Sequence, residues 1–292
     1  MTPSTRSGLS ALLKWVVPAG AIAAAGYLAW VSPIFRPTPQ QQEQILKDAD
    51  TALLDGRLDA AAEKFRRVSF LQPRSARASF GLGLVRMREG RHADALTAFD
   101  HAAQLEPGNP DHAYARARTL SLLGRRDEAI ATLDSLHDSD PSRLDAEFDR
   151  IALLIDAQRW SDAEIAVTEA LGRAAGHYGF RLQAGRIAGH EGNHAKAIEH
   201  YGIARQIRPY APQPIYGFIE EYRASGRIDD ARALLPVFEA LRARAAELEK
   251  LRDAGLAAPA DPAPSLRYLE RLFEEGWLDE GVEQTSLFLN LH

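Results

Sequence analysis

The stretch HEGNHAKAIEH, residues 190–200, contains residue types that could bind a catalytic metal ion. His190 and His194 are four residues apart, and Glu191 follows the first of them. On one unbroken helix this spacing places both imidazoles beside a single Zn²⁺ ion, with the glutamate as general base on a bound water. His200 stands where a longer form of the motif has its third histidine. These residues raise the alternative of a zinc metallopeptidase, which the surrounding elements must support or exclude.

The composition is that of an ordered protein without thiol chemistry. Apolar residues make up 46% of the chain and charged residues 26%, and there is no cysteine. Disulfides, thiolate zinc sites and a cysteine nucleophile are therefore excluded. Residues 1–36 contain three bases and no acid, so the remainder has 32 bases against 40 acids. A body with this negative charge repels nucleic acid, and we expect no nucleic-acid partner.

An uncharged stretch near the N-terminus predicts a membrane-spanning helix. Lys14 and Arg36 enclose 21 residues without a charge, and a helix of that length spans roughly 30 Å, the thickness of a bilayer core. Trp15 and Trp30 stand toward its two ends, where interfacial aromatic residues occur. We predict a cytoplasmic segment over residues 1–14, a transmembrane signal anchor over 15–35 and a polar tether over 36–41.

The flanking charges favour one orientation of this anchor. Arg6 and Lys14 precede it and Arg36 follows it, so the positive-inside rule places the N-terminus in the cytoplasm. With a bacterial source, favoured by the excess of arginine over lysine, the body would face the periplasm from the inner membrane. A cleaved signal peptide, a buried core helix and a body facing the cytoplasm are the alternatives. Small residues in the anchor, among them Ala19 and Gly20, leave a homo-oligomer open.

The body repeats itself with a period of 34 residues. A turn position is glycine in five of six units, and the position five residues later is alanine in all six. The turn positions are Gly56, Gly90, Gly124, Gln158, Gly192 and Gly226, and the alanines are Ala61, Ala95, Ala129, Ala163, Ala197 and Ala231. A larger apolar residue stands four residues after each alanine. Six units of two helices are thus predicted over residues 42–245.

This pattern resembles the tetratricopeptide repeat. The resemblance implies an all-α fold, a right-handed superhelical solenoid of helix-turn-helix repeats, which the transmembrane helix would precede. In each unit the glycine supplies the backbone freedom of the inter-helix turn, and the small alanine lets the second helix approach the first. Because one pair cannot bury its apolar faces alone, stacked pairs share a continuous core.

Beyond the sixth unit the 34-residue register is lost. Helical spacing of apolar residues continues to about Gly255, and a segment rich in proline and alanine follows. We predict a helix extension and linker over residues 246–264, and a degenerate seventh repeat or capping helix pair over 265–292 with Gly276 at its turn. A docking element for a partner is the alternative for this last segment.

The repeat register changes the interpretation of the HEGNH stretch. Gly192 is the turn position of the fifth unit, so we expect His190 to end one helix and His194 to begin the next. Ala197 stands where the longer zinc motif has glycine. The metallopeptidase alternative is therefore disfavoured, and no other catalytic or phosphate-binding signature occurs. We expect no enzymatic activity, no metal site and no cofactor.

The resemblance implies that partners bind in the concave groove lined by the first helix of each unit. One column of that helix is apolar or aromatic in all six units, with arginines interspersed, and such residues are enriched in protein interfaces. The predicted groove residues are Phe80, Tyr114, Phe148, Tyr216, Arg88, Arg118, Arg186 and Arg223. Co-chaperones of this family clamp a C-terminal carboxylate with basic and amide residues, and that function is disfavoured. The corresponding positions hold Leu46, Asp50, Asp111 and Ala115.

The function predicted from these features is that of a membrane-anchored scaffold. It would bind a protein or peptide partner in the groove and serve the assembly or biogenesis of a bacterial cell-envelope complex.

Overall fold

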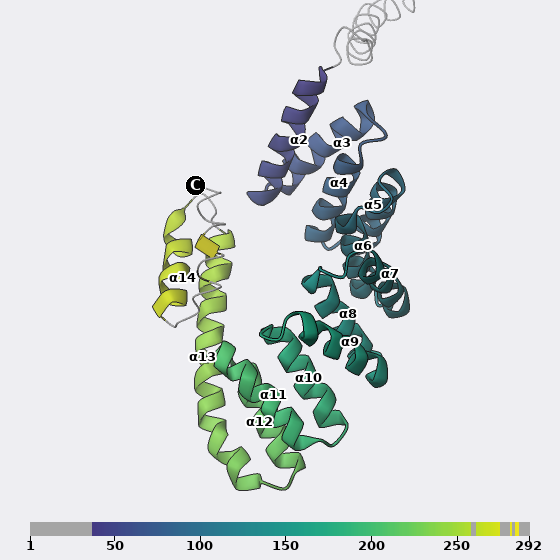
Figure 1. Ribbon diagram of the computed structural model, residues 1–292. Coiled ribbons are helices and arrows are strands. Elements are labelled where there is room, and N and C mark those ends of the chain that lie inside the picture. Colours follow the sequence, from purple (N-terminus) through teal and green to yellow (C-terminus); the bar gives the residue numbers. More distant parts are fainter. Residues whose placement is uncertain (1–36, 258–260, 275–280, 282–283, 286–292) are drawn as a thin grey trace, which may run out of the picture. The chain divides into compact units, whose positions relative to one another are not determined.

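The computed structural model describes residues 37–257, 261–274, 281, 284 and 285. Within these residues all regular secondary structure is α-helical, as Figure 1 shows. The all-α prediction is therefore confirmed. The predicted cytoplasmic segment, residues 1–14, and the predicted anchor, residues 15–35, lie outside the described residues. Of the helices in the described part, none combines the length and the apolar character needed to cross a bilayer.

The helices form two compact units, one ending at Pro107 and the other beginning at Gly108. The first unit contains α2 (Pro39–Leu54), α3 (Leu58–Leu71), α4 (Ala76–Arg88) and α5 (His92–Leu105). The second unit begins with α6 (Pro110–Leu122), α7 (Arg126–Ser139), α8 (Leu144–Asp156), α9 (Trp160–Arg173) and α10 (Tyr178–His190). It continues with α11 (His194–Ile207), α12 (Pro212–Ala224), α13 (Ile228–Ala257) and α14 (Pro262–Glu274).

The first described helix begins inside the segment predicted as a tether. The Thr38 side chain accepts a hydrogen bond from the backbone N–H of Gln41 at 3.3 Å, and the Gln41 side chain accepts one from the Thr38 N–H at 2.8 Å. This reciprocal cap, with Pro39 at the first helical turn, fixes the start of α2. The tether predicted over residues 36–41 is therefore too long, because its second half is helix.

Paired helices are joined by tight turns with a left-handed backbone residue at each turn. In the first unit, Gly56 and Gly90 both have φ of 72°. In the second unit, Gly124, Gly192 and Gly226 have φ of 73°, 75° and 76°. Gln158 takes the same conformation, with φ of 59°, although a side chain disfavours it. All six predicted turn positions are thus confirmed as turns.

The alanine column and the large residue after it form the interior of the pairs. In the first unit Ala61, Phe65, Ala95 and Phe99 are all fully buried. The second unit repeats this arrangement in successive pairs, with cores around Leu133, Val167 and Tyr201. Phe65 also packs against Gly81 of the next pair, and Tyr201 packs against Gly217 of the next pair, so adjacent pairs within each unit share a core, as stacked repeats require.

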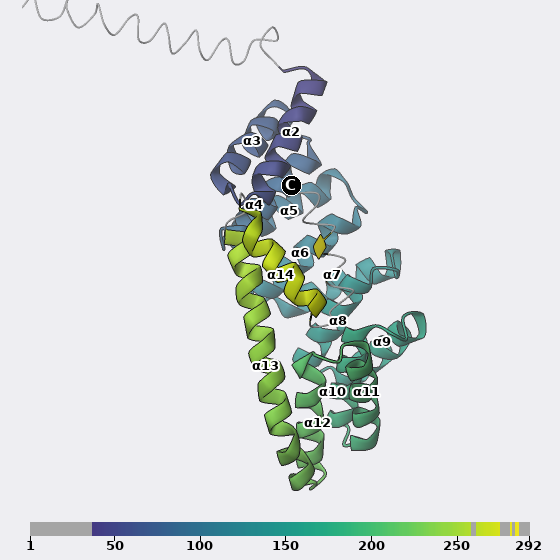
Figure 2. The same cartoon turned by 90° about the vertical axis from the view of Figure 1, so that its left-hand side faces the viewer.

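The second unit ends with a long helix that carries a further helix along its length. α13 runs for 30 residues through Pro236 without interruption, and α14 packs against its second half through Leu248, Tyr268, Leu269 and Leu272. Figures 1 and 2 show α14 beside the C-terminal half of α13. Beyond the sixth unit α13 continues to Ala257, and α14 begins at Pro262, within the predicted linker. Most of the predicted seventh pair after Glu274 lies outside the described residues.

Candidate partner-binding groove

The HEGNH residues lie on two different helices. α10 ends at His190, α11 begins at His194, and Gly192 lies in the turn between them. The prediction that the motif straddles an inter-helix junction is therefore confirmed. The one-helix geometry that would direct both imidazoles to one metal ion is absent.

Each histidine of the stretch has a different neighbour. The His190 ring stacks on Trp160 with ring centroids 3.7 Å apart. His194 Nδ1 lies 2.8 Å from Glu221 Oε2. His200 Nδ1 lies 3.3 Å from Arg181 Nη1. Among the described residues there is no cluster of three or more side chains arranged to hold a metal ion.

A cavity of about 750 Å³ opens on the face formed by α8, α10, α12 and α13 of the second unit. We call it the larger groove cavity. Its apolar lining includes Phe148, Leu182, Tyr216 and Phe238, and its charged lining is Arg186, Glu220, Glu221 and Arg242. Of the predicted groove residues, the structure thus brings Phe148, Arg186 and Tyr216 together around one cavity.

Tyr216 is the most accessible aromatic residue of this cavity. Its side chain is 51% exposed, and its ring centroid lies 5.8 Å from that of Phe238 on α13. Phe148 is half-buried and lies against the backbone of Gly179. The pair of Tyr216 and Phe238 therefore presents an aromatic surface that solvent, or a partner, can reach.

A buried tyrosine supports the cavity from beneath. Tyr201 of α11 is 5% exposed, and its ring lies between the backbones of Gly185 on α10 and Gly217 on α12. Burial raises the pKa of Tyr201, and the carboxylate of Glu221 raises it further, so the phenol is neutral at physiological pH. The close approach of three helices around this ring fixes the positions of the cavity walls.

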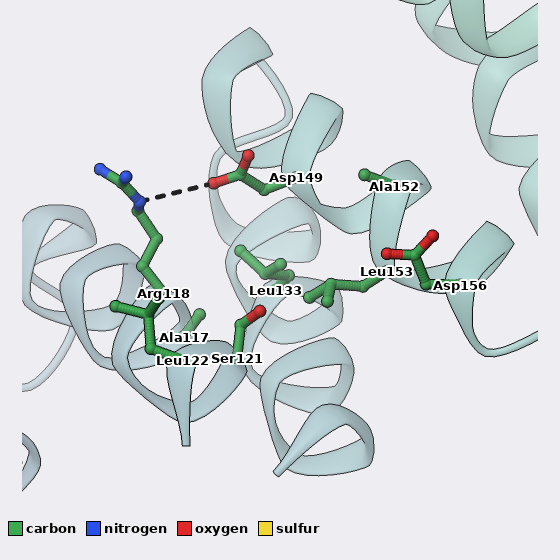
Figure 3. Close-up of a pocket in the computed structure, with 9 residues that line it drawn as sticks. All are labelled: Ala117, Arg118, Ser121, Leu122, Leu133, Asp149, Ala152, Leu153 and Asp156. Atoms are coloured by element: carbon green, nitrogen blue, oxygen red, sulfur yellow. Dashed lines mark ion pairs between the residues drawn. The ribbon is translucent and has the colours of Figure 1, made fainter. Parts of the chain in front are cut away.

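A second, smaller cavity of about 260 Å³ lies between α6, α7 and α8 (Figure 3). Its wall contains Arg118, whose Nε lies 3.8 Å from Asp149 Oδ2. Burial raises the pKa of Asp149. Ala152 lines this smaller groove cavity and the larger one, so the two are neighbours along α8.

Tyr114 contacts Asp149 but does not line either cavity. Its hydroxyl donates a hydrogen bond to Asp149 Oδ2 at 2.9 Å, and the Arg143 guanidinium lies 5.0 Å from its ring centroid. The side chain is half-buried by these contacts. Tyr114 therefore orders the wall of the smaller cavity and offers a partner less surface than Tyr216 does.

The remaining predicted groove residues lie elsewhere. Phe80 and Arg88 belong to the first unit, where Phe80 packs against Phe99 with ring centroids 5.3 Å apart. The Arg88 guanidinium donates to the backbone carbonyl of Leu53. Arg223 is exposed and pairs with Glu220 at 3.1 Å without lining the larger cavity.

Comparison with protein-family models decides the class of the fold. Two models, both described as Tetratricopeptide repeat, match residues 46–110 and 148–212 in one case and 86–148 in the other. Together they span more than half of the chain. The chain belongs to the tetratricopeptide repeat family. A comparison with curated proteins found no match.

Solved tetratricopeptide structures resemble the chain at low sequence identity. A tetratricopeptide repeat protein from Parabacteroides merdae has 18% identity and a TM-score of 0.62, covering 86% of this chain and 99% of its own. PilF of Pseudomonas aeruginosa has 16% identity and a TM-score of 0.57, and the match covers 67% of this chain and 89% of the PilF chain. YrrB, described as a tetratricopeptide protein with an unusual peptide-binding site, has 20% identity and a TM-score of 0.53. The match covers 59% of this chain and 89% of the YrrB chain. These likenesses concern the fold.

Sequence reasoning missed several residues of the larger cavity. Trp160 and Tyr201 come from second helices of tetratricopeptide pairs, and Phe238 and Arg242 come from α13. Expecting groove residues in first helices alone excluded all four. A signal for Phe238 was present, because the equivalent positions of three earlier units hold the smaller residues Ala102, Ala170 and Ala204.

Proposed function

We propose that this tetratricopeptide protein is a scaffold without catalytic activity that binds a protein or peptide partner in the groove of its second unit. The observation that carries the proposal is the larger groove cavity, which combines an exposed aromatic surface with arginines at its edge. Central aromatic and arginine side chains dominate the energy of protein interfaces. The peptide-binding site in the description of YrrB agrees with this use of the fold.

We further propose that residues 15–35 anchor the scaffold in a bacterial inner membrane, with the body in the periplasm. The uncharged length of this segment and the bases before it support the anchor and its orientation. The scaffold would then serve assembly or biogenesis of an envelope complex. A reporter active on only one side of the membrane, fused after His292, tests the orientation. Activity on the cytoplasmic side would support the alternative of a cytoplasmic scaffold.

Tyr216→Asp tests the groove itself. The Tyr216 side chain is half exposed, so its replacement should leave the melting temperature unchanged. The same replacement should abolish partner binding. Ile165→Asp is the matched control, because Ile165 is 60% exposed on α9 and lines neither groove cavity. Equal partner recovery by both variants and the unmodified chain would contradict the proposal.

A further inference from the structure

The charged side chains around the larger groove cavity differ in how closely they are paired. Glu221 is 7% exposed and lies 2.8 Å from His194, and Glu220 lies 3.1 Å from Arg223. Both carboxylates of the cavity therefore already have a close partner. A ligand gains little from contacts with groups that are satisfied within the protein.

The two arginines of the cavity are more available. Arg186 is exposed, and its closest carboxylate, Asp156, lies 3.8 Å away, beyond the distance of a good hydrogen bond. Arg242 is exposed and has no ion pair within the described part of the chain. Guanidinium groups in this state can donate several hydrogen bonds to a carboxylate of a partner.

The second of these arginines lies on α13, the second helix of the sixth unit. α13 carries both Phe238 and Arg242 along the cavity. Phe238 faces Tyr216 with ring centroids 5.8 Å apart. α13 thus supplies one aromatic and one cationic group to the same side of the site.

We infer that the larger groove cavity recognises an internal acidic-aromatic peptide segment. A bulky apolar side chain of the partner would enter beside Tyr216 and Phe238, and neighbouring Asp or Glu carboxylates would reach Arg186 and Arg242. The inference rests on the proposed function and names the partner's chemistry. The recognised groups are side-chain carboxylates, so a free C-terminus is not required. Because the body is acidic overall, its net charge disfavours carboxylate binding at sites that lack such arginines.

A peptide selection tests this inference. A library of random 12-residue peptides would be selected on the purified full chain, and enriched sequences would be resynthesised with amidated C-termini and a fluorescein label. We expect enrichment of Asp and Glu beside Phe, Tyr or Trp. Fluorescence anisotropy should show roughly tenfold weaker binding for Arg186→Glu and for Arg242→Glu, and weaker binding at higher salt. Arg232→Glu, on α13 outside the cavity, is the matched control and should stay within about twofold.

The outcomes separate the inference from the proposed function. Enriched peptides that are basic or uncharged, yet lose affinity with Tyr216→Asp, would leave groove binding in place and overturn the inferred chemistry. If no enriched peptide depends on Tyr216, groove binding itself is contradicted. Melting temperatures of all variants, expected to match that of the unmodified chain, show that a lost signal comes from the site.

Discussion

The α-carbon of Gly185 lies directly against the ring of Tyr201. A Cβ added at residue 185 would stand 2.5 Å from Cε1 of that ring, and Tyr201 is buried. The glycine is therefore required by close packing between α10 and α11, since its backbone φ is not in the left-handed region. This contact lies beneath the larger groove cavity, so the packing of the repeat and the shape of the site depend on one another.

Gly185→Ala should lower the free energy of unfolding by about 1–3 kcal/mol, because the added methyl group overpacks a buried ring. Gly202→Ala is the matched control, since Gly202 lies within α11 and an added Cβ there meets nothing within 4 Å. Alanine is the better helix former, so the control should gain roughly 0.5–1 kcal/mol. Urea unfolding monitored by circular dichroism measures both. Equal effects of the two substitutions would refute the packing argument.

A buried carboxylate stabilises the middle of the second unit. Glu147 is 2% exposed; its Oε2 lies 2.7 Å from His137 Nδ1, and its Oε1 accepts a hydrogen bond from Arg150 at 3.0 Å. Glu147→Gln should cost about 1–3 kcal/mol, because it removes the buried carboxylate charge that pairs with the Arg150 guanidinium. The exposed Glu164, 3.5 Å from Lys196, provides the control Glu164→Gln, with an expected change below about 0.5 kcal/mol. A larger loss of stability in Glu164→Gln than in Glu147→Gln, measured by thermal unfolding, would contradict this prediction.

His177 makes stability depend on pH. Its Nδ1 accepts a hydrogen bond from the backbone N–H of Phe180 at 3.3 Å and caps α10. Burial lowers the pKa of His177, and the charge of Arg208 lowers it further. Below the ordinary value of 6.5 the unfolded chain thus binds more protons than the folded one. The contribution of the His177 cap to the free energy of unfolding is therefore present above about pH 6.5 and is lost as the pH falls below that value.

His177→Asn keeps a cap acceptor and removes the titration. The free energy of unfolding of the unmodified chain should fall between pH 7 and pH 5, and that of His177→Asn should fall less, by roughly 1 kcal/mol. Part of the dependence should persist, because burial and then Arg181 lower the pKa of His200 as well. Identical pH profiles for the two chains would show that the cap is not the titrating contact.

The periodic part of the fold could be predicted from the sequence, because its determinants recur. Turn position 158 was predicted in spite of its glutamine, since the period itself locates it, and the structure gives it the same left-handed backbone as the glycines. The two ends of the described chain, which lack the repeat, could be predicted less accurately. The start of α2 depends on the Thr38 cap, and the start of α14 at Pro262 depends on packing against α13.

The site was predictable only in part, for a related reason. Phe148, Arg186 and Tyr216 share one cavity because they occupy equivalent or neighbouring positions of successive first helices. Tyr114 occupies an equivalent position, yet its hydroxyl donates a hydrogen bond to Asp149 and its ring lines neither cavity. That contact joins individual side chains of two units, and no periodic pattern contains it.

Zinc should not bind stoichiometrically to the HEGNH stretch. His190 stacks on Trp160 and His194 pairs with Glu221 from separate helices, so neither imidazole is free to share a metal ion with the other. Isothermal titration with Zn²⁺ should show no one-to-one binding tighter than the micromolar range, and His194→Ala should leave the titration unchanged. One tightly bound zinc ion per chain, lost in His194→Ala, would support the metallopeptidase alternative.

The most direct test of the groove account is site-specific photocrosslinking in the intact cell. A photoreactive phenylalanine analogue would be placed at residue 216 or 182, both in the larger groove cavity, or at the exposed residue 165 outside it. The account predicts that one partner is captured from residues 216 and 182 and not from residue 165, and that Arg242→Glu reduces the yield. Capture of the same partner from residue 165 with none from the cavity would contradict it.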